Sequence, residues 1–254
     1  MVAIYARFKR VYGKIWKQYL VEHLIGTCEE MIECLNRSYI RKALETLTKV
    51  IPINFSDIIE AAKIVATFHD IGKSMYYYQK QTDDVLSSQK DFITFQNHEI
   101  ISGYILAKTF NNIPDFIFTN PRIQQLIIQA ILLHHQGLRT LSIAELDEVR
   151  GIINDRNNSE YNIRNLNQVC NELIKHSNER IVKMISEKVY TFSKDIIDDY
   201  YNPQMIINYY SSLPEDWIKI SRAITGCLII ADVKNAHKTM GDEETKFIKD
   251  IFKF

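Results

Sequence analysis

The stretch Phe68-His69-Asp70-Ile71-Gly72-Lys73 places a histidine and an aspartate at the end of an apolar run, residues 64–68. A second polar doublet, His134-His135, ends the apolar run of residues 126–133. Burying such side chains costs several kcal/mol unless they meet one another or a cation. Imidazole and carboxylate together are ligands of zinc, manganese, iron, cobalt and nickel, and carboxylate also suits magnesium. The doublets therefore predict a metal site at the ends of buried helices.

Three glycines follow histidines closely in the sequence. Gly72 and Gly137 each lie two residues after a doublet, and Gly26 follows His23. Glycine commonly ends a helix in the left-handed conformation, so we expect these glycines to end the helices that present the histidines. Two of the remaining three histidines, His176 and His237, have no such setting and are expected to be ordinary hydrogen-bonded residues.

The composition predicts a folded, helical chain. It is 46% apolar, with 31 basic and 31 acidic side chains, and its 254 residues include only 8 glycines and 5 prolines. This scarcity of turn residues argues against an all-β fold, and the zero net charge argues weakly against a protein that coats nucleic acid. Four cysteines without a close pair indicate reduced thiols in a cytoplasmic protein. We expect neither a signal peptide nor a membrane span, because no apolar run approaches 18 residues.

The N-terminal segment is basic and aromatic. Five aromatic residues recur at spacings of 3, 4, 4 and 3, which predicts an amphipathic helix that packs its aromatic stripe into the core. They are Tyr5, Phe8, Tyr12, Trp16 and Tyr19. The other interpretation is a basic aromatic surface for single-stranded nucleic acid. In either case the cations Arg7, Arg10, Lys14 and Lys17 are candidates for phosphate contact.

Helical periodicity also covers most of the remaining chain. The predicted helices are 14–36, 38–50, 56–71, 97–110, 121–136, 162–176, 178–198, 203–211, 215–238 and a short one at 243–252. Residues 77–96 and 154–162 are expected to be exposed loops. The sequence thus predicts an all-α protein with one domain over residues 1–254.

With His23 before the first doublet and Asp232 near the end of the chain, the order is H…HD…D. This order resembles the HD superfamily of metal-dependent phosphohydrolases. The added His98 and His134-His135 match its binuclear subset. Within the superfamily the chain is most similar to the stand-alone, double-prime HD nuclease of type I CRISPR interference. The resemblance implies a compact helical bundle with the metal site at its centre, and it leaves residues 140–215 as a less recognisable helical insertion.

The resemblance also implies the ligands and the chemistry. One metal ion would be held by His23, His69, Asp70 and Asp232, and the second by His98, His134 and His135, with Asp70 bridging. The metals implied are manganese, magnesium, cobalt, nickel or iron. A metal-activated water would attack a phosphodiester of single-stranded DNA, or of RNA, as an endonuclease or exonuclease. Asp70 and Lys73 are the expected catalytic residues, although Lys73 equally suits a solvated cation at a helix end.

The expected partners are an RNA-guided CRISPR effector complex that presents an R-loop and a separate helicase, in antiviral defence. The helicase would be separate because the chain has no phosphate-binding loop of the G-x-x-x-x-G-K-[ST] type.

Three other functions remain open at this point. The first is a small-molecule phosphohydrolase acting on nucleotides or cyclic nucleotides. Its cyclic-dinucleotide branch expects a Gly-Tyr-Pro element soon after the histidine doublet, where this chain has Gln136-Gly137-Leu138. The second is a di-iron oxygenase built on similar ligands, and the third is a helical binding module with a degenerate site.

Overall fold

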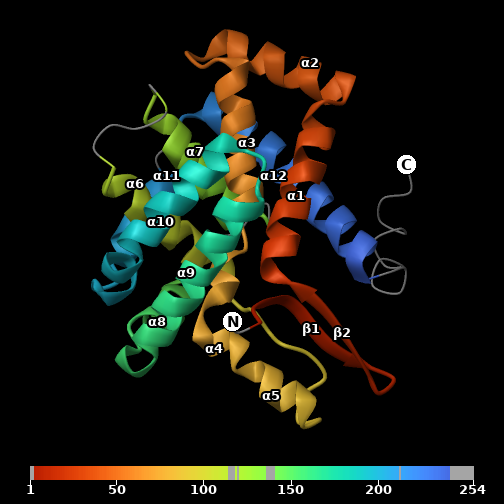
Figure 1. Ribbon diagram of the computed structural model, residues 1–254. Coiled ribbons are helices and arrows are strands. Elements are labelled where there is room, and N and C mark those ends of the chain that lie inside the picture. Colours follow the sequence, from red (N-terminus) through yellow and green to blue (C-terminus); the bar gives the residue numbers. More distant parts are fainter. Residues whose placement is uncertain (1–2, 114–117, 119, 136–140, 212, 241–254) are drawn as a thin grey trace.

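The computed structural model describes residues 3–113, 118, 120–135, 141–211 and 213–240. Within these ranges the chain is mainly helical, with one small antiparallel sheet (Figure 1). The strands are β1 (Tyr5–Val11) and β2 (Lys14–Tyr19). The helices are α1 (Leu20–Leu35), α2 (Ser38–Leu47), α3 (Phe55–Phe68), α4 (Tyr76–Gln79), α5 (Gln81–Leu86), α6 (His98–Asn111), α7 (Arg122–Leu133), α8 (Ile143–Ile153), α9 (Ser159–His176), α10 (Arg180–Asp198), α11 (Pro203–Ser211) and α12 (Glu215–Met240). Three short 3₁₀ helices join them, namely η1 (Thr48–Val50), η2 (Ile71–Ser74) and η3 (Arg156–Asn158).

Helix α3 lies at the centre of the bundle, in contact with α1, α7, α10 and α12. Most side chains of α3 and α6 are buried, so these helices are covered on nearly all sides. Burying each large aliphatic side chain contributes roughly 1.5–3 kcal/mol. One large apolar core therefore unites the described helices, and the predicted helical-bundle fold is confirmed.

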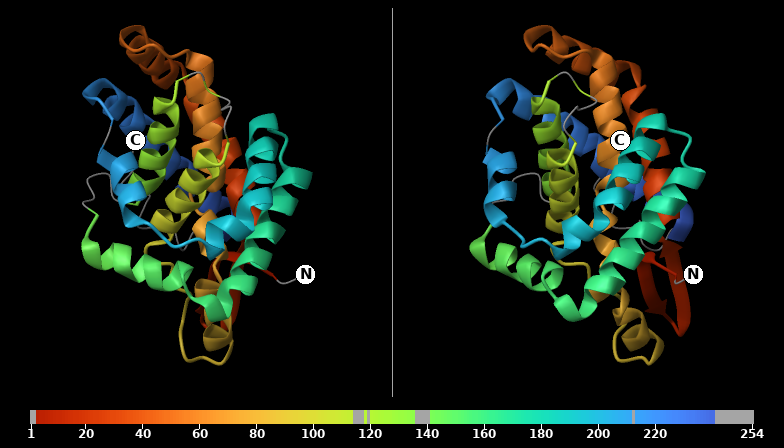
Figure 2. Two further views of the ribbon diagram at one scale, coloured as in Figure 1. Left: turned by 90° about the vertical axis from the view of Figure 1, so that its left-hand side faces the viewer. Right: turned by 60° about the vertical axis from the view of Figure 1, so that its left-hand side comes forward.

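Within residues 140–215, the predicted insertion, the structure has helices α8 to α11. Helices α9 and α10 lie side by side and pack on the central helices, as Figure 2 shows. None of the described helices combines the length and the apolar character that a bilayer span requires.

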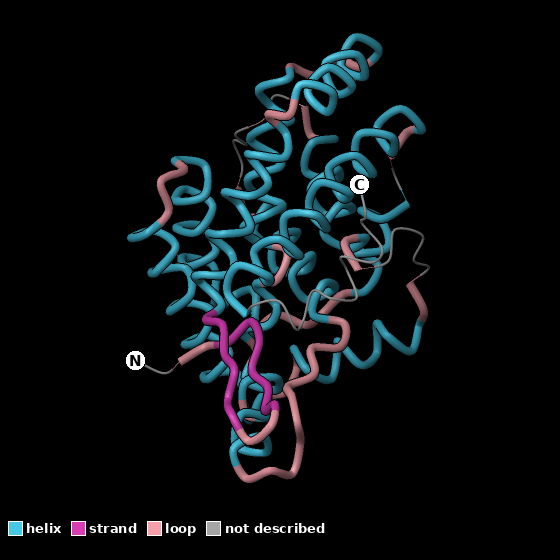
Figure 3. The backbone as a smooth tube through the Cα atoms, turned by 90° about the vertical axis from the view of Figure 1, so that its right-hand side faces the viewer, coloured by secondary structure: helices cyan, strands magenta, loops and turns pink. Residues whose placement is uncertain are grey.

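The predicted N-terminal amphipathic helix is wrong, because residues 5–19 form a β-hairpin that extends from the helical body (Figure 3). Tyr12 and Gly13 both have positive φ, of 48° and 77°, as a two-residue hairpin turn requires. Side chains alternate between two faces of a strand, so the aromatic residues do not share one surface. Tyr5 stacks on Tyr19 across the hairpin, whereas Trp16 lies opposite Lys9.

Several other boundaries differ from the predictions. The segment expected as a loop over 77–96 contains α5 and the end of α4, and the loop expected over 154–162 contains η3 and the start of α9. Helix α8 was not predicted. The helix expected at 243–252 lies outside the described residues.

The prediction that these glycines end helices is wrong for the two that the structure describes. Gly26 lies inside α1 and Gly72 inside η2, and both have a negative φ, while Gly137 lies outside the described residues. The two described glycines are needed for close packing. A Cβ on Gly72 would come within 2.3 Å of the His98 carbonyl oxygen, and one on Gly26 within 1.9 Å of the Asn235 side chain.

Candidate metal centre

Five elements bring the seven predicted ligands together. His23 comes from α1, and His69-Asp70 follows α3. His98 begins α6, His134-His135 follows α7, and Asp232 lies on α12. These residues form two groups, each with ligand atoms within 4.8 Å of one another, and Asp70 belongs to both groups. The first group is His23, His69, Asp70 and Asp232, and the second is Asp70, His98, His134 and His135. Their role as ligands stays a prediction.

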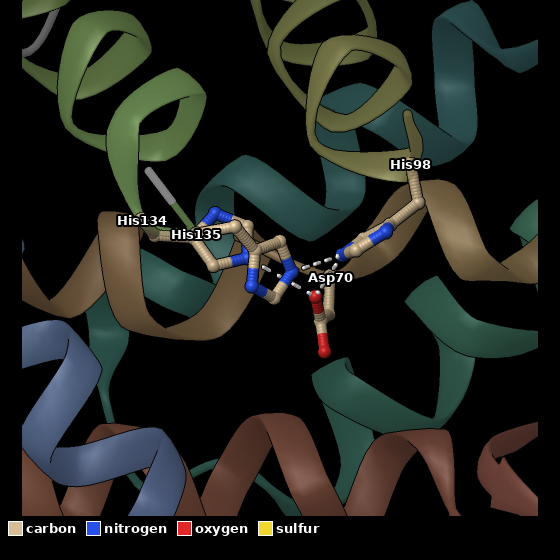
Figure 4. Close-up of side chains that lie close together, drawn as sticks. All are labelled: Asp70, His98, His134 and His135. Atoms are coloured by element: carbon tan, nitrogen blue, oxygen red, sulfur yellow. Dashed lines mark hydrogen bonds and ion pairs between the residues drawn. The ribbon is translucent and has the colours of Figure 1, made fainter. Parts of the chain in front are cut away.

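Asp70 lies fully buried between the two groups, and each of its oxygens faces a different one. Its Oδ2 lies 3.0 Å from His23 Nε2, and its Oδ1 lies 2.7 Å from His98 Nε2. Figure 4 shows the imidazoles of the second group converging on this carboxylate from two directions. A carboxylate with one oxygen facing each group is the geometry that a bridging ligand needs.

Backbone carbonyls fix the orientation of three imidazoles. In each case Nδ1 donates a hydrogen bond to the carbonyl oxygen three residues earlier. The pairs are His69 with Ala66 at 2.8 Å, His134 with Ile131 at 2.6 Å, and His98 with Phe95. A carbonyl oxygen only accepts, so Nδ1 carries the proton and Nε2 points toward Asp70. Metal-binding histidines are held in this way.

Two of these Nε2 atoms, on His69 and His134, are buried without a hydrogen-bond partner among the described residues. They lie 3.4 and 3.5 Å from the oxygens of Asp70. A lone pair there would face a carboxylate, and a proton there would lack an acceptor of good geometry. A divalent cation between the nitrogens and the carboxylate would satisfy both, so the residues present fit the implied metal ions.

The protonation states at neutral pH also suit metal binding. Burial lowers the pKa of His69 to about 3 and that of His98 to about 4, so both imidazoles are neutral. Burial raises the pKa of Asp70, but His69, Lys73 and His98 outweigh it and hold that pKa well below its usual range. Neutral imidazole and ionised carboxylate are the forms that coordinate a metal ion.

Lys73 is buried and belongs to the same centre. Its Nζ lies 2.6 Å from Asp70 Oδ2 and 5.0 Å from the centroid of the Phe95 ring. The 3₁₀ helix η2 positions it, because Lys73 follows Asp70 by three residues and its amide donates to the Asp70 carbonyl. Lys73 is therefore a cation held at the centre, which disfavours the alternative of a solvated helix end.

Two further residues that the sequence did not place here lie at this centre. Arg7, expected as a phosphate contact, reaches it from β1, and its Nη2 lies 3.0 Å from Asp232 Oδ1. Burial raises the pKa of Asp232, but Arg7 and His23 outweigh it and lower that pKa. Asn235 accepts a hydrogen bond from His23 Nδ1 at 3.0 Å and another from Gln18 on β2 at 2.8 Å. No sequence signal placed either residue at the metal centre, because both positions depend on how the hairpin packs against α12.

The remaining candidate residues lie elsewhere. Arg10 donates hydrogen bonds to the carbonyls of Val85 and Leu86, and Lys14 and Lys17 are exposed on β2. The exposed His176 pairs with Glu172, and His237 lies on α12 outside both groups.

A cleft of about 660 Å³ opens onto the second group of ligands. His98, His135 and Lys73 line it, together with Arg7 and Phe95. His135 is the exposed member of its group. The centre can therefore be reached by a substrate from this side.

Comparison with known proteins finds relatives of one kind. The family model described as "Cas3, HD domain" matches residues 8–232, a range that contains all seven candidate ligands. The chain is 24% identical over 219 residues to a CRISPR-associated endonuclease Cas3-HD from Saccharolobus solfataricus. That alignment covers 85% of this chain and 84% of the relative. No solved structure gives a significant match.

Proposed function

Since this chain belongs to the Cas3 HD-domain family, we propose that it is a metal-dependent nuclease that hydrolyses phosphodiester bonds in single-stranded DNA. The proposal extends to the setting, in which an RNA-guided complex exposes the strand in an R-loop and a separate helicase feeds it to this protein. The relative's description as a CRISPR-associated endonuclease supports this setting.

The single observation that carries the proposal is the shared carboxylate. Asp70 faces imidazole nitrogens of both groups, and two of those nitrogens have no hydrogen-bond partner among the described residues. In the proposal, His23, His69, Asp70 and Asp232 hold one divalent ion, and Asp70, His98, His134 and His135 hold the other. Paired divalent ions supply Lewis-acid activation of water and neutralise charge on the reacting phosphate.

The chain's own residues complete the proposed site. Lys73 stays paired with Asp70, so it fixes the orientation of the shared carboxylate and places a positive charge beside the cleft. Arg7 pairs with Asp232 and holds that carboxylate in place. A phosphodiester that enters the cleft thus meets cationic groups in its lining, which favours an anionic substrate.

The test is cleavage of a labelled single strand by protein first freed of metal with a chelator. Mn²⁺, Mg²⁺, Co²⁺, Ni²⁺ and Fe²⁺ are added singly, with wild type compared with Asp70→Asn. We expect cleavage with at least one ion and a loss of about 10³-fold in Asp70→Asn. Asp83→Asn, which changes an exposed carboxylate on α5, is the matched control and should cleave like wild type.

Further arms of the same experiment separate the alternatives. Cutting of a covalently closed single-stranded circle identifies an endonuclease, and a single-stranded RNA of the same sequence measures the preference for DNA. If folded wild type cleaves no more than folded Asp70→Asn with every ion, the nuclease proposal is wrong. Hydrolysis of cyclic dinucleotides alone would favour the small-molecule enzyme. A content of one ion per chain would contradict the paired site.

A further inference from the structure

The two faces of the β-hairpin differ in chemistry. The cross-strand pairs Arg7 with Gln18, Lys9 with Trp16, and Val11 with Lys14 alternate with the pairs Phe8 with Lys17 and Arg10 with Ile15. Side chains that alternate along a strand point to opposite faces, so the first three pairs share one face. Arg7 and Gln18 on this face contact residues of α12 at the metal centre. The first face therefore runs from the metal centre to the hairpin turn.

The segment after α5 adds a second aromatic residue to this face. Ile93 donates to the Phe8 carbonyl at 3.0 Å and Arg10 donates to the Asp91 carbonyl, which sets Phe92 directly opposite Lys9. This segment runs beside β1 in Figure 1. Directly opposed residues of an antiparallel pair place their side chains on the same side. Lys9 thus lies between Trp16 on one neighbouring strand and Phe92 on the other.

Two aromatic side chains of this face are exposed. Trp16 is 37% exposed and Phe92 is 58% exposed, although large aromatic side chains usually contribute to a core. The opposite face behaves in the ordinary way, since Phe8 packs in a buried cluster with Val85 and Ile93. Phe8 therefore contributes to the packing of the fold, whereas Trp16 and Phe92 expose part of their rings to solvent on the first face.

This face continues into the cleft of the metal centre. Lys9 and Phe92 line the same cleft as Lys73 and His98. The acidic side chains of Glu99 and Glu145 also line it. An anionic backbone is therefore drawn toward the wall formed by the hairpin.

We propose that this face, defined by Arg7, Lys9, Lys14, Trp16 and Phe92, is a track that binds the single-stranded DNA substrate beside the cut site. The inference rests on the proposed nuclease function and names the surface that holds its substrate. Bases stack on Trp16 and Phe92, and Lys9 and Lys14 contact phosphates. Arg10 and Lys17, on the other face, take no part.

The geometry suits an unpaired strand. Alternate side chains along a strand stand about 7 Å apart, and neighbouring strands of a sheet lie about 4.8 Å apart. Aromatic rings flanking a lysine at this spacing offer faces for stacking next to a positive charge. Stacking of this kind needs bases that are free of a complementary strand, so a duplex of the same sequence should bind more weakly.

Binding is measured without metal, in the presence of a chelator, so that no cleavage occurs. The chain has two tryptophans, and the other one, Trp217, is buried. Addition of single-stranded oligothymidylate should therefore quench the fluorescence of Trp16. Trp16→Phe should lose the quenching but keep its affinity within about threefold, measured by anisotropy of a labelled strand. Trp16→Ala and Phe92→Ala should each lower the affinity about tenfold.

Matched variants separate the track from general effects. Lys9→Gln should weaken binding and reduce the dependence on salt, lowering the slope of log K against log salt by about 0.7. Lys17→Gln, on the opposite face of the same hairpin, should bind like wild type. Tyr190→Ala, which removes an exposed aromatic ring from α10, should also bind like wild type. Circular dichroism checks that each variant is folded.

Two results would overturn the track. The first is equal affinity in wild type, Trp16→Ala and Phe92→Ala, and the second is equal weakening by Lys9→Gln and Lys17→Gln. A failure of the proposed nuclease function is distinguished from a failure of the track, because cleavage is measured with metal and binding is measured without it. A wild type that cleaves single strands while Trp16→Ala binds normally overturns the track alone. A wild type that binds through the track and cleaves nothing overturns the nuclease.

Discussion

Asp70 is the residue on which both groups of candidate ligands depend. One oxygen faces His23 and the other faces His98, and Lys73 pairs with the first of them. The imidazoles cannot turn away, because the Nδ1 atoms of three of them are hydrogen-bonded to the backbone. The site is thus assembled before any ion arrives, and ions bound there should not need to reorganise their ligands.

Substitution of a single histidine should therefore change metal binding strongly. His69→Gln replaces an imidazole whose Nε2 lacks a partner, so we expect the affinity of one ion to fall by at least about 100-fold. Isothermal titration with Mn²⁺ measures this loss. His176→Gln changes an exposed histidine and should titrate like wild type. Equal titration curves for His69→Gln and wild type would exclude His69 as a ligand.

At the scale of elements, close contacts between helices hold the candidate ligands in position. Helix α1 approaches α12 where Gly26 meets Asn235, and η2 approaches α6 where Gly72 meets the His98 backbone. The second contact fixes Asp70 relative to His98, because Asp70 directly precedes η2 and His98 is the first residue of α6. The same close contacts therefore determine how these elements pack and where the candidate ligands lie.

Two glycine substitutions should have opposite effects on stability. Gly72→Ala forces a Cβ against the His98 carbonyl oxygen and should lower the free energy of unfolding by about 1–3 kcal/mol. Gly226→Ala, inside α12 with no atom within 4 Å of the new Cβ, should raise it by about 0.5–1 kcal/mol. Urea unfolding of the metal-free proteins measures both. A free energy of unfolding that Gly72→Ala leaves unchanged or raises would contradict the packing described for η2.

The limits of sequence-based prediction also lie at this scale. The long helices were predicted because their apolar residues repeat with the helical period, whereas the hairpin was missed because its aromatic residues fall by chance at spacings of three and four. The only glycine among the first twenty residues, Gly13, was the available signal for a turn. The sequence also held a signal for the start of helix α8, since Ser142 and Glu145 form a reciprocal capping box there.

For the candidate site, the resemblance of the order of histidines and aspartates to that of the HD superfamily selected all seven residues that the structure brings together. Arg7 and Asn235 could not be placed in this way. Their contacts arise from the packing of β1 and β2 on α12, more than 200 residues apart in the chain. Sequence order carries no information on such contacts without the topology.

For the whole molecule, a net charge of zero hides an uneven distribution. Two aspartates at the centre are ionised, two buried histidines are held neutral, and the cations of the hairpin lie on one side of the cleft. Buried neutral histidines make the free energy of unfolding depend on pH, because in mild acid the unfolded chain binds more protons than the folded chain. The metal-free protein should accordingly be sensitive to mild acid.

The sign of this effect follows from the two pKa values. His69 and His98 titrate near 6.5 when unfolded and at about 3 and about 4 when folded, so the unfolded state takes up protons as the pH falls below 6.5. The free energy of unfolding that these two histidines contribute is therefore complete above pH 6.5. It falls toward pH 4.5, by up to about 3 kcal/mol per pH unit. Urea unfolding between pH 7 and pH 4.5 measures this slope. His98→Gln should lower this slope by about 1.4 kcal/mol per pH unit, and a free energy of unfolding that is independent of pH would contradict the buried neutral state.

The positions of the ligands along the chain have a consequence for protein synthesis. The group of Asp70, His98, His134 and His135 is complete once residue 135 has been made, whereas the other group waits for Asp232. At a translation rate of about 5–20 residues per second, this interval lasts about 5–20 s. A copy released by the ribosome before α12 would hold one group of ligands without the other. On the proposed function, truncated copies are therefore poor nucleases, and the cell is spared cutting by incomplete chains.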